Sequence, residues 1–208
     1  MSTVTVNELI SDSALQVASE ETFEAWCNED TRAEYLDGEV IVHSPASFEH
    51  ETFLPRLTSV MEIYVEEKNL GVICGSNFQI RLRSGRRRMA DLCFISNARL
   101  PLAQDNFIDG APDLVIEVVS PESSDRDWHE KYLDYEAAGV REYLIIDFLS
   151  WRIAFYRLQS NGLFAPVQEQ DGKLHSHCLP GFWFKPEWFW QKPMPKTMEI
   201  LREIGLFK

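Results

Sequence analysis

The feature that most constrains the fold is a strand, a helix and a second strand between Asp113 and Asp147. The apolar run "DLVIEVV" is bounded by proline on both sides, which is typical of a strand covered on both faces. A helical stretch follows, and "EYLIIDF" is a second apolar run. This order predicts a right-handed crossover between two parallel strands. We therefore expect an α/β fold, a mixed sheet flanked by helices.

Two hairpins are predicted upstream of this unit. Asp37-Gly38 is a turn pair between short extended runs, which predicts an N-terminal hairpin over "AEYLDGEVIVH". "VICGSNFQIRL" and "RRMADLCFI" are joined by a turn with Gly85 and predict a long antiparallel hairpin. Between the hairpins, apolar spacings of three and four predict a helix over residues 47–68. Because no repeat or Gly/Ser linker interrupts the chain, residues 1–208 are expected to form a single domain.

The composition limits the classes of function. The chain has a formal net charge of -13, which repels nucleic acid at long range, so DNA binding requires locally gathered basic residues or metal ions. The opening residues lack a secretory signal, and no segment approaches the ~20 apolar residues of a membrane span. We therefore expect a cytoplasmic protein without membrane contact. The four cysteines form no CxxC pair, which argues against a zinc framework.

A carboxylate lies in the middle of the first buried strand. Glu117 requires a cation, a proton or an aqueous cleft, because burying an ionised carboxylate without compensation is costly. On the following helix, Lys131 shares a stripe with Trp128, Tyr132 and Tyr135, so it is predicted to point toward the sheet. The lysine could then meet Glu117. A buried ion pair without activity is one interpretation of this arrangement.

A second acid, Asp91, lies in the apolar segment "MADLCFI", on a strand predicted to neighbour that of Glu117. Two buried acids in one site raise a pKa strongly unless a cation compensates. Hard oxygen ligands favour Mg²⁺ or Mn²⁺. A divalent ion held by Asp91 and Glu117, beside Lys131, would suit metal-assisted hydrolysis of a phosphodiester. From spacing alone, the metal site and the structural ion pair both stay open.

The order of these motifs resembles a known family. Asp91 in "MADLCFI", Glu117 in "PDLVIEVVSP" and the segment "DWHEKYLDYEAAGVREYLIID" are similar to the Uma-two-type restriction endonucleases of the PD-(D/E)XK nuclease superfamily. Upstream, "EYLDGEVIVHSPASFEH" resembles the entry hairpin of that family. The likeness extends from about Phe23 to Trp183. It implies a restriction-endonuclease-like fold, Mg²⁺ as cofactor and DNA as substrate.

The resemblance also implies roles for individual residues. Asp91 matches the Asp of the PD motif and Glu117 the acid of (D/E)XK, both metal ligands, and the backbone carbonyl of Val118 is implied as a further ligand. The lysine of the superfamily commonly stands two residues after that acid, where this chain has Val119. Lys131 occupies the helix position at which this family carries a lysine and is interpreted as the migrated catalytic lysine.

Four further positions are weaker candidates. Glu51 falls on the inward stripe of the first long helix, where the superfamily often has an ancillary acid, so it joins the catalytic candidates. His50 matches a histidine of the family, and a solvated helix start is the alternative for both residues. Asp127 either closes a capping box or pairs with Lys131, and the cap is favoured. Asp113 lies at the edge of the site or is a turn residue.

Basic residues are concentrated around one hairpin turn. They are Arg81, Arg83, Arg86, Arg87 and Arg88. As the one dense basic cluster of an acidic chain, they either contact DNA phosphates near the metal site or form a solvated hairpin tip.

The aromatic segment "PGFWFKPEWFW" is expected either in the core or at a subunit contact, and it is the best candidate for the interface of the expected homodimer. The favoured function is a Mg²⁺-dependent endonuclease that hydrolyses DNA phosphodiester bonds. One alternative is a catalytically inactive module of the same fold that binds or assembles. Another is a metal-dependent hydrolase of a different substrate.

Overall fold

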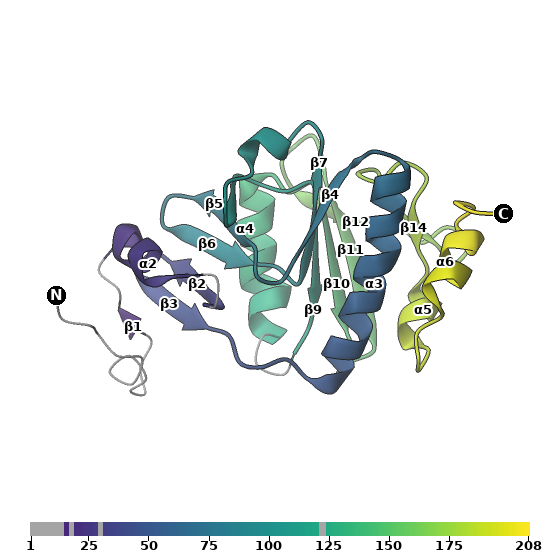
Figure 1. The fold of residues 1–208 in the computed structure, drawn as a ribbon, viewed down its shortest axis with the longest axis horizontal. Helices are drawn as coiled ribbons and strands as arrows, with labels where there is room; N and C mark the ends of the chain where they lie inside the picture. The colour runs from purple at the N-terminus through teal and green to yellow at the C-terminus, as the bar shows by residue number, and fades with distance from the viewer. Residues whose placement is uncertain (1–14, 17–18, 29–30, 121–123) are drawn as a thin grey trace.

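The computed structural model describes residues 15–16, 19–28, 31–120 and 124–208, and two six-stranded sheets lie side by side in it (Figure 1). The central sheet has the order β12 (Phe164–Pro166), β11 (Arg152–Leu158), β10 (Glu142–Asp147), β9 (Leu114–Val118), β7 (Leu92–Ser96) and β4 (Gly71–Gly75). The second sheet has the order β1 (Leu15–Gln16), β3 (Glu39–Val42), β2 (Ala33–Leu36), β6 (Arg86–Met89), β5 (Gln79–Arg83) and β8 (Phe107–Asp109). The predicted α/β class is confirmed, with two mixed sheets in place of one.

The predicted strand–helix–strand unit forms the middle of the central sheet. β9 and β10 are parallel, with Glu117 opposite Ile145. They are joined by the π-helical turn η2 (Arg126–Glu130), which continues directly into α4 (Lys131–Ala138). Gly139 ends α4 with a φ of 84°, a left-handed conformation that costs glycine little. The crossover therefore lays a helix with an inward lysine across the strand that carries the buried acid.

The predicted long hairpin is present but is divided between the two sheets. β5 pairs with β6 in the second sheet, and β4 pairs with β7 in the central sheet, both antiparallel. The chain passes from one sheet to the other at Ala90 and Asp91. β7 also pairs with β9, with Leu92 opposite Ile116, so the predicted adjacency of the two acidic strands is confirmed. Asp91 thus lies at the junction of the sheets.

The N-terminal part of the chain extends the second sheet. β2 and β3 pair antiparallel on either side of Asp37 and Gly38, whose φ values are 50° and 104°. α2 (Glu20–Trp26) begins after Ser19, whose hydroxyl accepts a hydrogen bond from a backbone N–H of the first turn. Phe23 of α2 stacks on Tyr35 of β2. A short 3-10 turn, η1 (Leu100–Leu102), precedes β8.

Helices cover both faces of the central sheet. α3 (Phe48–Glu67) lies on one face and α4 on the other (Figure 1). The pleat of β9 sends Ile116 into the cluster of apolar side chains under α3 and Val115 into the cluster under α4. α3 begins at Phe48 and contains Pro55 in its interior. None of the described helices is both long and apolar enough to cross a membrane.

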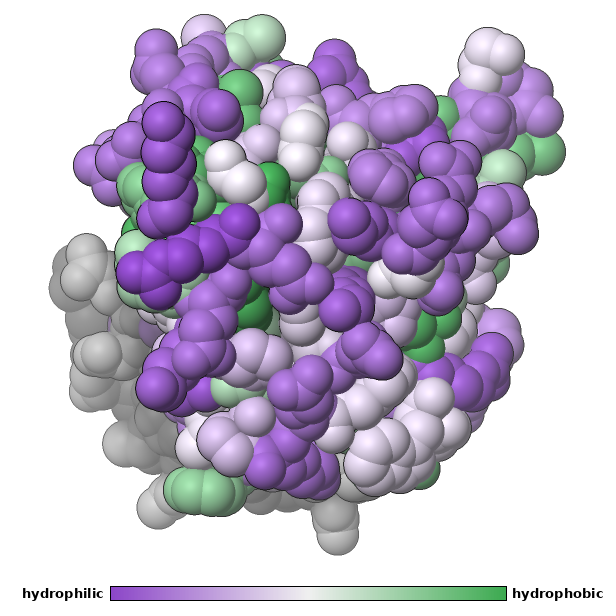
Figure 2. Space-filling model, turned by 90° about the vertical axis from the view of Figure 1, so that its right-hand side faces the viewer, coloured by the Kyte–Doolittle hydropathy of each residue, from purple (hydrophilic) through white to green (hydrophobic). Residues whose placement is uncertain are grey.

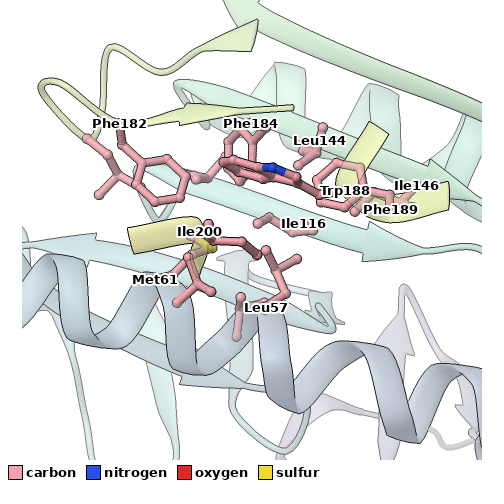
Figure 3. Packing of buried hydrophobic residues seen from close by; sticks show 14 of the residues in the cluster. Leu57, Met61, Ile116, Leu144, Ile146, Phe182, Phe184, Trp188, Phe189 and Ile200 are labelled. Carbon is pink, nitrogen blue, oxygen red and sulfur yellow. The ribbon is translucent and has the colours of Figure 1, made fainter. Parts of the chain in front are cut away.

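The aromatic segment near the C-terminus is part of the core. It runs through β13 (Leu174–His175), β14 (Trp183–Phe184) and α5 (Pro186–Trp190), and α6 (Thr197–Glu203) follows. Its aromatic side chains are buried in one cluster with Leu57 and Met61 of α3 (Figure 3). They are Phe182, Phe184, Trp188 and Phe189. The core role expected of this segment is therefore confirmed, and because its own chain covers these rings, they do not offer the alternative subunit contact. Figure 2, which views the molecule from the side of α5 and α6, shows a mostly hydrophilic surface there.

Candidate active site

A cleft of ≈ 680 Å³ collects the strongest sequence candidates in one place. Its lining includes Asp91 from the sheet junction, Glu117 and Val118 from β9, and Lys131 from the start of α4. The loop after β3 and the first turn of α3, with His50, form another part of the wall. The crossover and the divided hairpin therefore bring together side chains as far apart in the chain as His50 and Lys131.

Lys131 is the centre of a buried charged cluster. Its Nζ lies 2.9 Å from Glu117 Oε1 and 3.2 Å from Asp127 Oδ1. A third carboxylate, that of Glu34, is 3.6 Å away, and the carbonyl of Met89 accepts a hydrogen bond at 3.1 Å. Burial alone would disfavour a charged lysine, but these carboxylates raise the pKa of Lys131. The lysine is therefore a buried cation that points toward the sheet, as its helix stripe predicted.

Among Glu34, Asp91 and Glu117, Glu117 is the acid whose pKa is raised. Its side chain is buried, and Oε1 accepts from Lys131 and, at 2.9 Å, from the hydroxyl of Tyr135. Burial raises the pKa of Glu117, and the neighbouring charges of Asp127 and Asp91 raise it further in spite of the lysine. The single cation of Lys131 is shared by three carboxylates, so it compensates the charge of Glu117 only in part. An additional cation would stabilise the carboxylate.

Asp91 is fixed from two sides. Its Oδ2 accepts the backbone N–H of Val118 at 2.7 Å, and its Oδ1 lies 3.0 Å from Nε2 of His50. Burial opposes the charged form, but the imidazole of His50 lowers the pKa of Asp91. The carboxylate in turn raises the pKa of His50 through the same hydrogen bond. Asp91 is therefore an ionised, oriented carboxylate at the wall of the cleft.

The donors at this position fit a hard divalent cation. Asp91 and Glu117 present carboxylate oxygens, and Mg²⁺ is often held by one or two carboxylates together with water and substrate oxygens. Within residues 15–16, 19–28, 31–120 and 124–208, no group of three or more His, Cys, Asp or Glu side chains is arranged to hold a metal ion. The side chains would therefore supply only part of a coordination shell. Val118, whose carbonyl is a predicted ligand, lines the cleft beside them.

Sequence reasoning missed Glu34, a fully buried acid on β2. Its carboxylate accepts a hydrogen bond from the guanidinium of Arg88 at 2.8 Å and faces Lys131. Burial opposes its ionisation, but Lys131, His43 and Arg88 together hold the pKa of Glu34 below its ordinary value. The signal was available in the sequence, because a glutamate inside the apolar run "AEYL" has the same desolvation cost as the acid in β9.

Asp127 is buried in η2 and forms an i,i+4 ion pair with Lys131. This is the less favoured of its two predicted roles. The π-helical turn contributes to the placement, since it widens the helix just before Lys131. Turns of this kind are frequent at functional sites.

Two other acids lie outside the cleft lining. Glu51 is 63% exposed in its side chain, so the predicted inward orientation is wrong. Glu51 belongs to the first turn of α3. The buried residues of this helix begin only at Phe53, so the first turn does not pack against the core. Asp113 is buried and pairs with Arg141 at 2.8 Å, and its other oxygen accepts the N–H of Ser96. Its contacts are structural.

All five arginines of the β5–β6 hairpin form ion pairs with carboxylates of the same chain. The pairs are Arg81 with Asp109, Arg83 with Asp37, Arg86 with Asp37 and Asp134, Arg87 with Glu20 and Glu24, and Arg88 with Glu34, Glu130 and Asp134. None of the five lines the cleft. Arg87 and Arg88 are 2% and 0% exposed, so the predicted phosphate contacts are not available to them in this fold. For Arg81, Arg83 and Arg86 phosphate contact stays a prediction.

A family model described as "Putative restriction endonuclease", named Uma2, matches residues 20–187 of the chain. The chain belongs to the Uma2 family. The match includes Glu34, Asp91, Glu117 and Lys131, so the charged cluster lies inside the family region. No curated protein matches this Uma2 chain.

Among solved structures, the Uma2 chain is similar to a "putative nuclease belonging to DUF820" from Anabaena variabilis. The TM-score is 0.70 at 17% sequence identity, and the match covers 84% of this chain and 98% of the other. At that identity the similarity establishes the fold and does not transfer residue roles.

Proposed function

We propose that this chain is a Mg²⁺-dependent endonuclease that hydrolyses phosphodiester bonds of DNA. The observation that carries the proposal is one cleft in which the strand acids Asp91 and Glu117 lie beside the buried, cationic Lys131. Membership of the Uma2 family, whose description is "Putative restriction endonuclease", supports the same function. Mn²⁺ would serve the same oxygen donors as Mg²⁺.

The residues of the cleft have distinct proposed roles. Asp91 and Glu117, with the carbonyl of Val118, would hold the metal, which when bound supplies polarisation of the phosphate and a more acidic water. Lys131 directs a fixed positive charge toward the negative charge that develops on the phosphate. Asp127 keeps this lysine charged and oriented.

Supporting contacts hold these groups in place before substrate arrives. Tyr135 donates to Glu117 and fixes its carboxylate, while His50 and the N–H of Val118 fix that of Asp91. Pre-orientation of this kind reduces the reorganisation that the reaction would otherwise require. The carboxylate of Glu34 lies 3.6 Å from Nζ of Lys131 and favours the protonated form of the lysine.

The alternative is an inactive module in which Lys131 only neutralises Glu117. The observation that favours it is their 2.9 Å contact. Against it, Lys131 is shared by Glu117, Asp127 and Glu34, so it is not a dedicated partner of Glu117, and Glu117 lines an open cleft together with Asp91. A homodimer stays a prediction for an enzyme that cuts both strands, and the buried aromatic segment no longer supplies its interface.

The test compares wild type with Glu117→Gln, using Glu67→Gln on the exposed end of α3 as the matched control. Thermal unfolding is followed across Mg²⁺ and Mn²⁺ titrations, and nicking of plasmid DNA is assayed under the same conditions. We expect metal to raise the melting temperature of wild type and of the control, because an ion that binds only the folded state stabilises it. Both should nick the plasmid, and Glu117→Gln should show neither effect.

A different set of results would contradict the nuclease proposal. If metal leaves all three proteins unchanged and no plasmid is nicked, while Glu117→Gln is merely less stable, then Glu117 is a structural partner of Lys131. The nuclease proposal would then be abandoned in favour of the inactive module.

A further inference from the structure

Buried nitrogen atoms that lack a hydrogen-bond partner within the protein are concentrated in the cleft. In the part of the chain that the structure describes there are four of them: Nε of Arg32, Nε of Arg126, Nε2 of His43 and Nδ1 of His50. All four residues line the cleft. Folded proteins pair most buried polar groups, so unpaired ones gathered in one place indicate a functional surface.

Two of these residues carry permanent positive charge. Arg32 and Arg126 form no ion pair with any carboxylate among the described residues, in contrast to every arginine of the β5–β6 hairpin. A guanidinium is always charged at neutral pH and offers only donors, so its preferred partner is an anion with several acceptor oxygens.

The backbone around both arginines is anchored to the site. The carbonyl of Arg32 accepts the N–H of His43, which ties the start of β2 to the strand end that leads into the cleft wall. The carbonyl of Arg126 accepts the N–H of Lys131 across the π-helical turn. Arg126 also immediately precedes Asp127. The two guanidiniums therefore extend from segments that also position the charged cluster.

The cleft needs such cations if it is to receive a phosphodiester. Asp91, Glu117 and Asp127 repel an approaching anion, and the net charge of the chain is -13. Lys131 is already enclosed by carboxylates. Arginine side chains are well suited to the task, because their planar fork of donors matches the oxygens of a phosphate.

We propose that Arg32 and Arg126 are the phosphate-binding residues of this cleft and hold the DNA backbone beside Asp91, Glu117 and Lys131. This assignment rests on the proposed nuclease function and specifies which side chains bind its substrate. It replaces the arginine-rich hairpin as the principal site of phosphate contact.

The test measures binding separately from cleavage. Arg32→Ala, Arg126→Ala and the double variant are compared with wild type and with Arg202→Ala, an exposed arginine of α6 outside the cleft lining. Anisotropy of a fluorescein-labelled DNA duplex with phosphorothioate linkages, which resist cleavage, is recorded with Mg²⁺ and with EDTA over a series of salt concentrations. Plasmid nicking is assayed in parallel, and circular dichroism melts confirm that each variant is folded.

Each cleft variant should bind DNA about tenfold more weakly than wild type, and the slope of log K against log salt should fall by roughly 0.9 for each arginine removed. Arg202→Ala should match wild type. The conservative variant Arg126→Lys should keep the salt slope of wild type and should bind DNA more tightly than Arg126→Ala. Lysine keeps the positive charge but lacks the planar set of donors of the guanidinium.

The outcomes separate this inference from the function on which it rests. If wild type nicks DNA and the cleft variants bind and nick equally well, the arginine assignment is overturned and the nuclease stands. If wild type binds DNA through these arginines but does not nick it, the phosphate site stands and the nuclease proposal fails. Absence of DNA binding by wild type in both buffers overturns both.

Discussion

The β5–β6 hairpin and the cleft both carry arginines, but they use the charge in opposite ways. Every arginine of the hairpin is paired with a carboxylate of the same chain, whereas Arg32 and Arg126 in the cleft form no ion pair with the described residues. A dense run of basic residues in the sequence is therefore not the same as a positive surface. What matters is how many acids the fold brings to each cation.

The hairpin arginines connect the second sheet to the helices around it. Arg87 reaches from β6 to the glutamates of α2, and Arg86 and Arg88 reach Asp134 on α4. Arg88 also pairs with Glu34 on the neighbouring strand β2. Because the carboxylate of Glu34 also lies 3.6 Å from Nζ of Lys131, the ion pairs of the hairpin are connected to the charged cluster of the cleft.

The largest expected effect comes from breaking the buried end of the hairpin network. Arg88→Met removes the guanidinium that Glu34 and Asp134 share, and removing one partner of a buried pair typically costs about 3–5 kcal/mol. Urea denaturation gives the free energy of unfolding. The control is Arg83→Met, whose exposed pair with Asp37 should contribute less than about 1 kcal/mol. Equal losses for the two variants would contradict the distinction between buried and exposed pairs.

The second effect concerns activity in the cleft. Lys131→Met should lower the rate of plasmid nicking about 10²- to 10³-fold, as loss of one preorganised donor to a transition-state charge commonly does. Lys68→Met, at the exposed end of α3, is the control and should nick like wild type. The metal-induced rise in melting temperature should persist in Lys131→Met if that variant is folded. A nicking rate close to that of wild type would remove the lysine from the mechanism.

Much of this site could be predicted from the sequence because its central residues follow short-range periods. The helical stripe with Trp128 and Tyr135 predicted that Lys131 points toward the sheet, and the short crossover from Glu117 predicted that the two side chains could meet, as they do at 2.9 Å. The adjacency of β7 and β9 followed from the hairpin and the crossover. These inferences needed only local geometry and one topological rule.

The parts that sequence reasoning missed depend on contacts between distant segments. Glu34 joins the cluster because β2 pairs with β6, where Tyr35 lies opposite Arg87, and no local period reports that pairing. The same pairing gives the hairpin arginines their acids. The choice between core and subunit contact for the aromatic segment stayed open for the same reason, because its rings are covered by α3, more than a hundred residues earlier in the chain.

A third effect distinguishes the two regions by pH. Asp91 raises the pKa of His50, so their contact stabilises the fold fully below the unfolded pKa of about 6.5, and this contribution is lost as the pH rises through the folded pKa. His50→Gln should therefore lose on the order of 1 kcal/mol at about pH 5.5 and less at about pH 8.5. The loss in Arg88→Met should not become smaller at the higher pH, because arginine stays charged at both values and the buried Glu34 that it leaves behind is more costly in its ionised form. Metal-free urea denaturation at the two pH values is the measurement, and a His50→Gln loss that does not change with pH would refute the ionic contact.

The smallest expected effect is on the stability of the cleft variants. An arginine without an ion-pair partner gives the folded state little, and its buried Nε–H carries a desolvation cost. Arg32→Met and Arg126→Met should therefore change the free energy of unfolding by no more than about 0.5 kcal/mol, and the change can be stabilising. Arg87→Met, which breaks two ion pairs and a contact with Gln79, should lose considerably more in the same urea titrations. If both cleft variants lose as much stability as Arg87→Met, their guanidiniums serve the fold, and the contrast between a paired hairpin and an unpaired cleft does not hold.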